Sequence, residues 1–143
     1  MSIVERQQKI VDEFGAIADW EERYKRIIEY GRKMPAMDPA HQVDKNKVKG
    51  CQSTVWLHGD LKDGKVIFAG DSDAMIVRGL VALALSVYSD ATPAEILNTP
   101  PTFLEKTGLM SHLSQTRANG LAAVIKQIKF YALAFDTLLK RKA

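Results

Sequence analysis

The sequence contains a single cysteine, Cys51, and this scarcity excludes two kinds of site. One thiol cannot form a disulfide within the chain, and it cannot supply the several thiolates that hold a structural zinc ion or an iron–sulfur cluster. The three histidines, His41, His58 and His112, stand too far apart for a paired metal-ligand motif. The sequence therefore predicts no metal site.

Long hydrophobic runs and a strong charge imbalance are also lacking. The longest unbroken apolar run, Leu80 to Leu85, is much shorter than the ~18–20 residues that span a bilayer. The chain begins with acidic and amide side chains and shows no secretory signal pattern. The formal net charge of +3 comes from a basic C-terminal tail over about residues 140–143, because the remaining charges balance. We expect a reduced, cytoplasmic protein that binds neither nucleic acid nor a membrane.

The composition is that of a folded protein. The 143 residues are 46% apolar and 26% charged, and a chain of this length is expected to bury a core of its own. No repeat or linker divides it, so residues 1–143 are predicted to form a single domain.

Two amphipathic helices are expected in the first part of the chain. Apolar side chains at helical spacing predict a helix that ends at Gly15. A second helix begins after Asp19, which caps it, with Glu22 completing a capping-box pattern, and it ends before Pro35. Residues 34–46 contain two prolines and no periodicity, so they are expected to form a surface loop.

A β-hairpin is expected next. Residues 53–58 and 65–69 are rich in β-branched and aromatic side chains, and the Asp63-Gly64 pair between them suits a turn with positive φ. The residues around Val48 are a further strand candidate.

The second half predicts helices. Residues 74–88 are apolar nearly all round, as in a buried central helix, and Asp71, Ser72 and Asp73 are expected to cap it. Thr92 begins a short helix, a turn or two follows over 103–107, and Ser114 caps a long final helix whose apolar stripe runs to Leu139. The order of elements indicates an α+β fold, in which helices cover one face of a small antiparallel sheet.

Cys51 is the remaining candidate for chemistry, because the sequence has no phosphate-binding glycine loop and no nucleophilic serine motif. A free cysteine is often only a small buried residue. Here Gly50 allows a tight turn before it, polar Gln52 follows it, and three cations precede it, namely Lys45, Lys47 and Lys49. Cationic surroundings lower the pKa of a thiol, so the residues leave a reactive loop thiol and a packed one equally open.

Four blocks of the sequence resemble the SufE family of sulfur acceptor proteins, in family order and across nearly the whole chain. The block at the cysteine reads Gly50-Cys51-Gln52-Ser53-x-Val55-Trp56. The next reads Gly70-Asp71-Ser72-Asp73-Ala74-x-Ile76-Val77-x-Gly79-Leu80, and the last reads His112-Leu113-x-x-x-Arg117-x-x-Gly120-Leu121. An upstream block is Trp20-Glu21-Glu22-x-Tyr24-x-x-Ile27-Ile28-x-x-Gly31. The run Ser114-Gln115-Thr116 departs from the Thr-Pro-Ser that the family often has there.

The resemblance implies a sulfur relay. Members of the family take a sulfane sulfur from a pyridoxal-phosphate cysteine desulfurase of the SufS or CsdA type, stimulate that enzyme, and pass the sulfur to an iron–sulfur assembly scaffold of the SufBCD kind. Carried onto this sequence, Cys51 is the persulfide carrier in an IscU-like fold. The chain would then be a sulfurtransferase-type accessory protein without a cofactor of its own. The residues expected to support the cysteine or bind a partner are Gly50, Gln52, Asp73, His112 and Arg117.

Two structural expectations accompany this assignment. A loop that shelters Cys51 among apolar side chains would protect a persulfide from reductants. Arg117 lies in the first turn of a helix, where the helix dipole disfavours a cation, so we expect an acid beside it and choose Asp73.

Other functions stay open on the sequence alone. The chain could be a CsdE-like carrier that serves a different desulfurase and acceptor, or a cluster scaffold, against which its lone cysteine argues. It could also be a noncatalytic interaction module in which Cys51 only packs. The sequence does not decide the oligomeric state and leaves a homodimer open.

Overall fold

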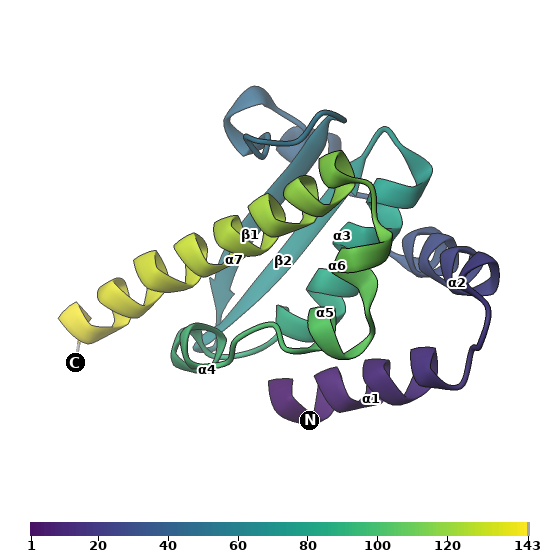
Figure 1. Ribbon diagram of the computed structural model, residues 1–143. Helices are drawn as coiled ribbons and strands as arrows, with labels where there is room; N and C mark the ends of the chain where they lie inside the picture. Colours follow the sequence, from purple (N-terminus) through teal and green to yellow (C-terminus); the bar gives the residue numbers. More distant parts are fainter. Residues whose placement is uncertain (143) are drawn as a thin grey trace.

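A two-stranded hairpin and the helices around it make up the fold. The computed structural model describes residues 1–142 and begins with α1 (Ile3–Gly15) and α2 (Trp20–Lys33). Strands β1 (Val55–Lys62) and β2 (Lys65–Ser72) follow, and then helix α3 (Met75–Tyr88). Three short helices, α4 (Pro93–Asn98), α5 (Phe103–Lys106) and α6 (Leu109–His112), lead to the long α7 (Gln115–Lys142). Figure 1 shows α7 crossing the hairpin, with α2 lying beyond α3.

The hairpin confirms the predicted turn and lengthens the predicted strands. The strands pair antiparallel from Val55 opposite Ser72 to Lys62 opposite Lys65. Asp63 and Gly64 have φ values of 53° and 78°, so both turn residues are left-handed as a tight hairpin requires. The third strand predicted near Val48 is reduced to a single bridge between Lys47 and Trp56.

Helices cover one face of the hairpin, as predicted. Side chains alternate along both strands, and the buried set lies on one face, namely Val55, Leu57, Val66 and Phe68. Helix α3 packs against β2 and helix α7 against β1. Tyr131 of α7 also donates a hydrogen bond to the Leu57 carbonyl, at 3.3 Å. The fold class is therefore α+β.

Helix α3 is the central helix. Every residue from Gly79 to Leu85 is buried, and the helix contacts α1, α2, β2 and α7. It crosses α2 at a point of backbone contact, where a Cβ added to Gly79 would lie 2.2 Å from the Ile27 carbonyl oxygen. The expectation of a helix buried on most sides is confirmed.

The helix starts only partly follow the prediction. Asp19 caps α2 by accepting the Glu21 N–H, and Ser114 caps α7 by accepting the Arg117 N–H. Helix α3 differs, because Ala74 is its N-cap and no side chain caps it. The predicted caps Asp71 and Asp73 are wrong, because Asp71 binds Arg78 and Gln42 and Asp73 accepts the Thr54 N–H. Of the predicted set, Ser72 alone bonds to the start of the helix, by accepting the Ala74 N–H.

The last part of α7 also differs from the prediction. The buried residues of this helix end at Ala132, and Leu138 is 42% exposed although it was predicted to continue the core stripe. Residues 140–142 form the last turn of α7 rather than a separate tail, and residue 143 lies outside the described range. Within residues 1–142, no helix is long and apolar enough to cross a membrane.

Candidate functional site

Cys51 lies in the loop that leads into β1 and faces helix α7. Its side chain is half-buried, and its Sγ is 3.5 Å from the Gly120 carbonyl oxygen. Gly50 has a φ of 92°, a left-handed conformation that costs glycine little. The loop therefore turns at Gly50 and brings the thiol against the first part of α7.

The thiol borders a cavity of about 430 Å³. One side of the cavity comes from the cysteine loop, through Cys51, Gln52 and Ser53. The walls are apolar side chains of α3 and α7, namely Ile76, Val77, Leu80, Val81, Leu121 and Val124. Polar side chains at the start of α7 complete the lining with Ser114, Thr116 and Arg117. The cavity thus offers the thiol apolar walls with a polar margin.

The electrostatic setting of the thiol has two opposed parts. Burial raises the pKa of the Cys51 thiol above its usual value. The first turns of α3 and α7 both line the cavity, and Arg117 lies there as well. Helix N-termini carry partial positive charge, so these groups favour an anion in the cavity. The thiol is therefore held in its neutral form beside groups that attract a negative charge.

The predicted effect of the three lysines is wrong. Lys45, Lys47 and Lys49 are exposed, and none of them lines the cavity. Lys47 pairs with Asp44 at 3.0 Å. Because solvent surrounds these cations while the thiol is turned toward α7, desolvation rather than positive charge sets the direction of the pKa shift.

The structure brings four of the predicted site residues together. Gln52 and Arg117 line the same cavity as Cys51, and Gly50 precedes the cysteine in its loop. Asp73 acts on the other end of that loop, where its carboxylate accepts the Thr54 N–H at 3.1 Å. The expected ion pair between Asp73 and Arg117 is wrong, because no salt bridge joins them within the described residues.

His112 lies apart from the cavity lining. Its ring stacks on Trp20 of α2 with centroids 3.9 Å apart, and its Nδ1 is 3.1 Å from the Gly108 carbonyl oxygen. Tyr24 of α2 donates to the His112 carbonyl at 2.7 Å. These contacts make His112 a packing residue between α6 and α2.

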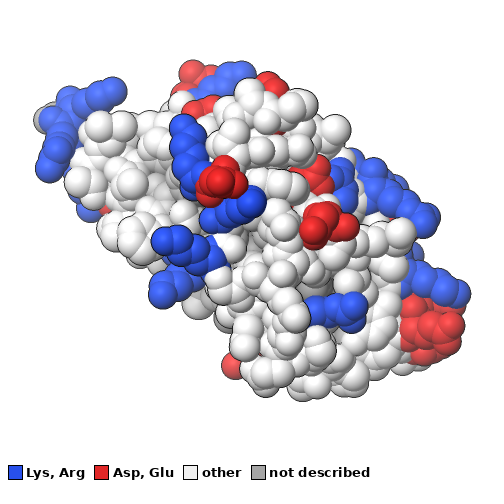
Figure 2. Space-filling view, turned by 90° about the horizontal axis from the view of Figure 1, so that it is seen from above, with Lys and Arg blue, Asp and Glu red and all other residues white. Residues whose placement is uncertain are grey.

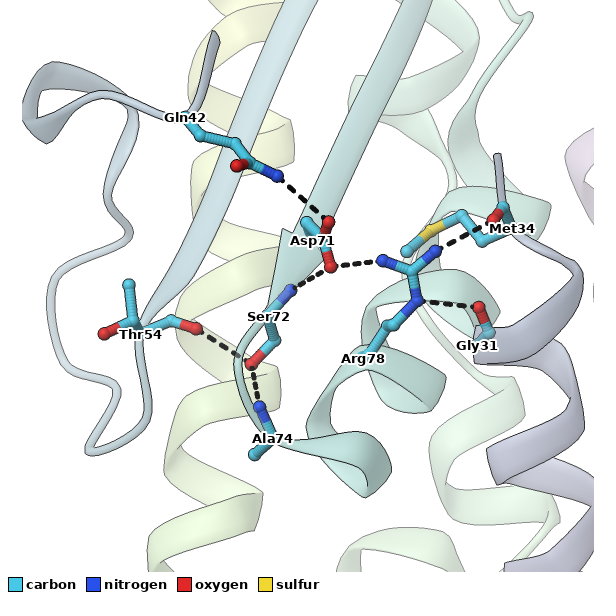
Figure 3. Close-up of polar contacts among 8 residues, drawn as sticks. All are labelled: Gly31, Met34, Gln42, Thr54, Asp71, Ser72, Ala74 and Arg78. Atoms are coloured by element: carbon cyan, nitrogen blue, oxygen red, sulfur yellow. Dashed lines mark hydrogen bonds and ion pairs between the residues drawn. The ribbon is translucent and has the colours of Figure 1, made fainter. Parts of the chain in front are cut away.

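Arg78 is a supporting residue that the sequence argument missed. Its guanidinium donates to the carbonyls of Gly31 (2.8 Å) and Met34 (2.9 Å), at the end of α2. It also pairs with Asp71, which accepts a hydrogen bond from Gln42 as well (Figure 3). A cation inside an otherwise apolar helix was the available signal, because such a residue needs buried partners.

Ser72 joins the two ends of the same region. Its hydroxyl donates to the Thr54 carbonyl at 2.8 Å and accepts the Ala74 N–H at 3.2 Å (Figure 3). The start of α3 and the segment after Cys51 are therefore fixed to one another. Across residues 1–142, no group of three or more His, Cys, Asp or Glu side chains is placed to hold a metal ion.

Comparisons with known proteins bear on the family and the fold. A family model described as "SufE: Fe-S metabolism associated domain" matches residues 8–132. An uncharacterized SufE-like protein of Synechocystis is 42% identical over 128 residues, which cover 90% of this chain and 80% of that protein. Another, from Rhizobium meliloti, is 43% identical over 126 residues, 85% of this chain and 90% of that one. The solution structure of a hypothetical protein from Thermus thermophilus has the same fold, with a TM-score of 0.78 at 24% identity, covering 92% of this chain and 96% of its own.

Proposed function

The chain belongs to the SufE family of Fe-S metabolism associated domains, and from this premise we propose that it is a sulfur acceptor that carries a persulfide on Cys51. One observation carries the proposal. The only thiol of the chain borders an apolar cavity whose polar margin holds Arg117 and the starts of two helices. A buried packing cysteine would need neither the cavity nor the positive margin.

The proposed step is a thiol exchange on a donor persulfide. The Cys51 thiolate attacks the terminal sulfur of the donor, so that a new S–S bond forms at Cys51 and the donor's S–S bond breaks. The donor leaves as a thiolate, and the electron pair of the broken bond stays with it. Atoms and charge balance without an oxidant, a reductant or a metal ion.

The raised pKa of the Cys51 thiol limits this step in the free protein. A neutral thiol is a poor nucleophile, so the isolated protein is expected to react slowly. A partner that draws the loop out of the cavity would remove the desolvation and release the thiolate.

The cavity suits the product of the step better than the resting thiol. A persulfide is longer and more acidic than a thiol, and about 430 Å³ leaves room for its second sulfur. Arg117 and the two helix N-termini would stabilise the persulfide anion. The apolar walls would keep reductants in solution away from the S–S bond.

The proposal includes partners of stated chemistry. The donor is a pyridoxal-phosphate cysteine desulfurase of the SufS or CsdA type, and the acceptor is an iron–sulfur assembly scaffold of the SufBCD kind. Gln52 and Arg117 both line the cavity and are both exposed, so they are available to a docked donor. In this role the chain itself holds no cofactor.

The test is the intact mass of the protein after incubation with a purified SufS-type desulfurase and L-cysteine. We expect a gain of about 32 Da, one sulfur atom, that a reductant reverses and that Cys51→Ser abolishes. Lys62→Ala changes the end of β1 remote from Cys51 and serves as the matched control, which should keep the gain.

No gain with a SufS-type enzyme but a gain with a CsdA-type enzyme would assign the chain to the CsdE-like branch. No gain with either enzyme would overturn the acceptor proposal and favour the interaction module. A purified protein that carries a coloured cluster would instead favour the scaffold.

A further inference from the structure

The second half of α7 presents an apolar strip that the described residues leave uncovered. Phe130 is 61% exposed, Leu133 53% and Leu138 42%, although the sequence pattern assigns the last to the core stripe. Burial on this helix ends at Ala132, while the helix continues to Lys142. Large apolar side chains that gather on one exposed face mark an interaction site more often than single ones do.

The shape of the strip suits the packing of another helix against it. A shallow hollow of about 270 Å³ is lined by Phe130, Leu133, Ala134, Thr137, Leu138 and Arg141. These positions are two overlapping sets with the spacing i, i+3, i+4, i+7, which begin at Phe130 and at Ala134. Four residues at this spacing surround the hole that accepts one side chain of a packed helix.

Two residues belong to both holes, and both are suited to packing against apolar side chains of another helix. Ala134 has a small side chain, so it does not fill the hollow. The hydroxyl of Thr137 donates to the Leu133 carbonyl at 2.9 Å, so its polar group is satisfied within the helix. The hollow can therefore accept apolar side chains without leaving a polar atom unpaired.

The charge of α7 selects the kind of partner. The helix has one acidic residue, Asp136, which pairs with Lys140 at 3.0 Å. Of its six basic residues, Arg117 lines the cysteine cavity and Lys129 donates to the Ile96 and Thr99 carbonyls. The cations at the end of the strip are Lys140, Arg141 and Lys142. In Figure 2 the end of the molecule where α7 stops carries Lys and Arg, with uncharged surface beside them. A helix with carboxylates beside its apolar side chains would complement this face.

We infer that residues 130–141 of α7 form a docking groove for an acidic amphipathic helix of a partner protein. Two apolar side chains of that helix, three or four residues apart, occupy the two holes. Its carboxylates face Arg141 and the neighbouring lysines. A second copy of this chain is a poor occupant, because pairing two basic helices brings like charges together.

The groove is separate from the cysteine site. Gly120, which contacts Cys51, lies ten residues before Phe130 on the same straight helix, which is about 15 Å along the axis. A partner held in the groove therefore leaves the Cys51 loop free to react. The inference does not rest on the proposed sulfur chemistry, since Cys51→Ser should leave binding in the groove unchanged.

The test uses a synthetic helical peptide of about 21 residues, three heptads, with Leu at the a and d positions and Glu at e and g. Its fluorescence anisotropy is titrated with the full chain at low and high salt. A second peptide, with Lys in place of Glu, tests the role of charge. The variant Phe130→Gln/Leu133→Gln replaces the two apolar side chains with glutamine, which is polar and a good helix former, so that the helix itself is preserved. Val4→Gln on α1 removes an equally exposed apolar residue and is the matched control.

We expect the acidic peptide to bind, salt to weaken it, and Phe130→Gln/Leu133→Gln to weaken it about tenfold or more. Val4→Gln should leave the affinity unchanged, and backbone amide shifts should map the peptide to residues 130–141. Equal binding of the two peptides, or no loss in the double variant, would overturn the inference. So would a dimer in sedimentation that the double variant dissolves, or tighter binding to phosphatidylglycerol vesicles than to the peptide.

Discussion

Cys51 is subject to two opposed influences at the scale of the single residue. Desolvation beside α7 raises the pKa of its thiol, while Arg117 and two helix starts attract negative charge to the cavity. The first influence acts on the resting thiol, and the second acts on any anion that enters. A thiol in this position is sheltered while it is neutral, and the cavity favours an anion over a neutral group.

Alkylation of Cys51 by iodoacetamide measures this protection. In the folded protein the reaction should be several-fold slower at pH 8 than in urea, and its rate should rise at a higher pH than that of an unfolded cysteine. Because the folded state holds the thiol proton more tightly, the free energy of unfolding should fall as pH rises from the usual thiol pKa to the raised one. Gln52→Cys in a Cys51→Ser background places the thiol at an exposed neighbour and should react at the unfolded rate. Equal rates at both positions would contradict the sheltered thiol.

At the scale of the element, the contact between α2 and α3 sets the position of α3 and therefore of the cavity wall that α3 forms. The backbones of Gly31 and Gly79 meet there, because a Cβ at Gly31 would lie 2.8 Å from the Gly79 nitrogen. Helix α3 supplies apolar residues to the cavity from its opposite side. Any side chain at the crossing would therefore displace the wall that faces Cys51.

The substitution Gly79→Ala should lower the free energy of unfolding by about 3 kcal/mol, because its Cβ meets the Ile27 carbonyl rather than a flexible side chain. Gly15→Ala is the control. Gly15 ends α1 with open space around the position of a Cβ, so alanine should be neutral or stabilise by about 0.5 kcal/mol. Urea unfolding of the two variants compares these effects. A similar result for both would show that the helices can separate at little cost.

At the scale of the whole molecule, Arg78 joins segments that are distant in the chain. It connects the end of α2 and the end of β2 to helix α3, and Asp71 extends the network to Gln42, which lies before the cysteine loop. Only 22% of the Arg78 side chain and 16% of the Asp71 side chain are exposed, so this pair is largely removed from solvent. Removal of Arg78 leaves the Asp71 carboxylate without its counter-charge and deprives the Gly31 and Met34 carbonyls of their guanidinium donor.

The change Arg78→Met should therefore cost about 2–4 kcal/mol, between the values for exposed and fully buried pairs. Arg26→Met breaks the more exposed pair with Glu13, whose arginine side chain is 44% exposed, and should cost no more than about 1 kcal/mol. Urea unfolding at low and high salt measures both. Equal losses, or a loss in Arg78→Met that salt removes, would argue that the Arg78 network is only a surface feature.

The sequence by itself determined the elements and the candidate thiol. The turn at Asp63-Gly64, the apolar stretch of α3 and the cap at Ser114 depend on backbone preferences and periodicities within a few residues, so they can be read locally. The resemblance to the SufE family also came from residues in order along the chain, and the comparisons confirm it. The roles of Gly50, Gln52, Asp73, His112 and Arg117 stay predictions.

Only the tertiary structure decided what surrounds that thiol. Cys51 contacts Gly120, 69 positions away, and the cavity takes its walls from α3 and α7 together. Desolvation depends on such distant neighbours, which is why the lysines beside Cys51 in sequence predicted the wrong direction for its pKa. Distant neighbours also explain why Asp71 pairs with Arg78 instead of capping α3. They explain Leu138 as well, which the pattern assigned to the core although this part of α7 extends beyond the core. Periodicity shows which face of a helix is apolar, but the rest of the fold determines how far along the helix that face is covered.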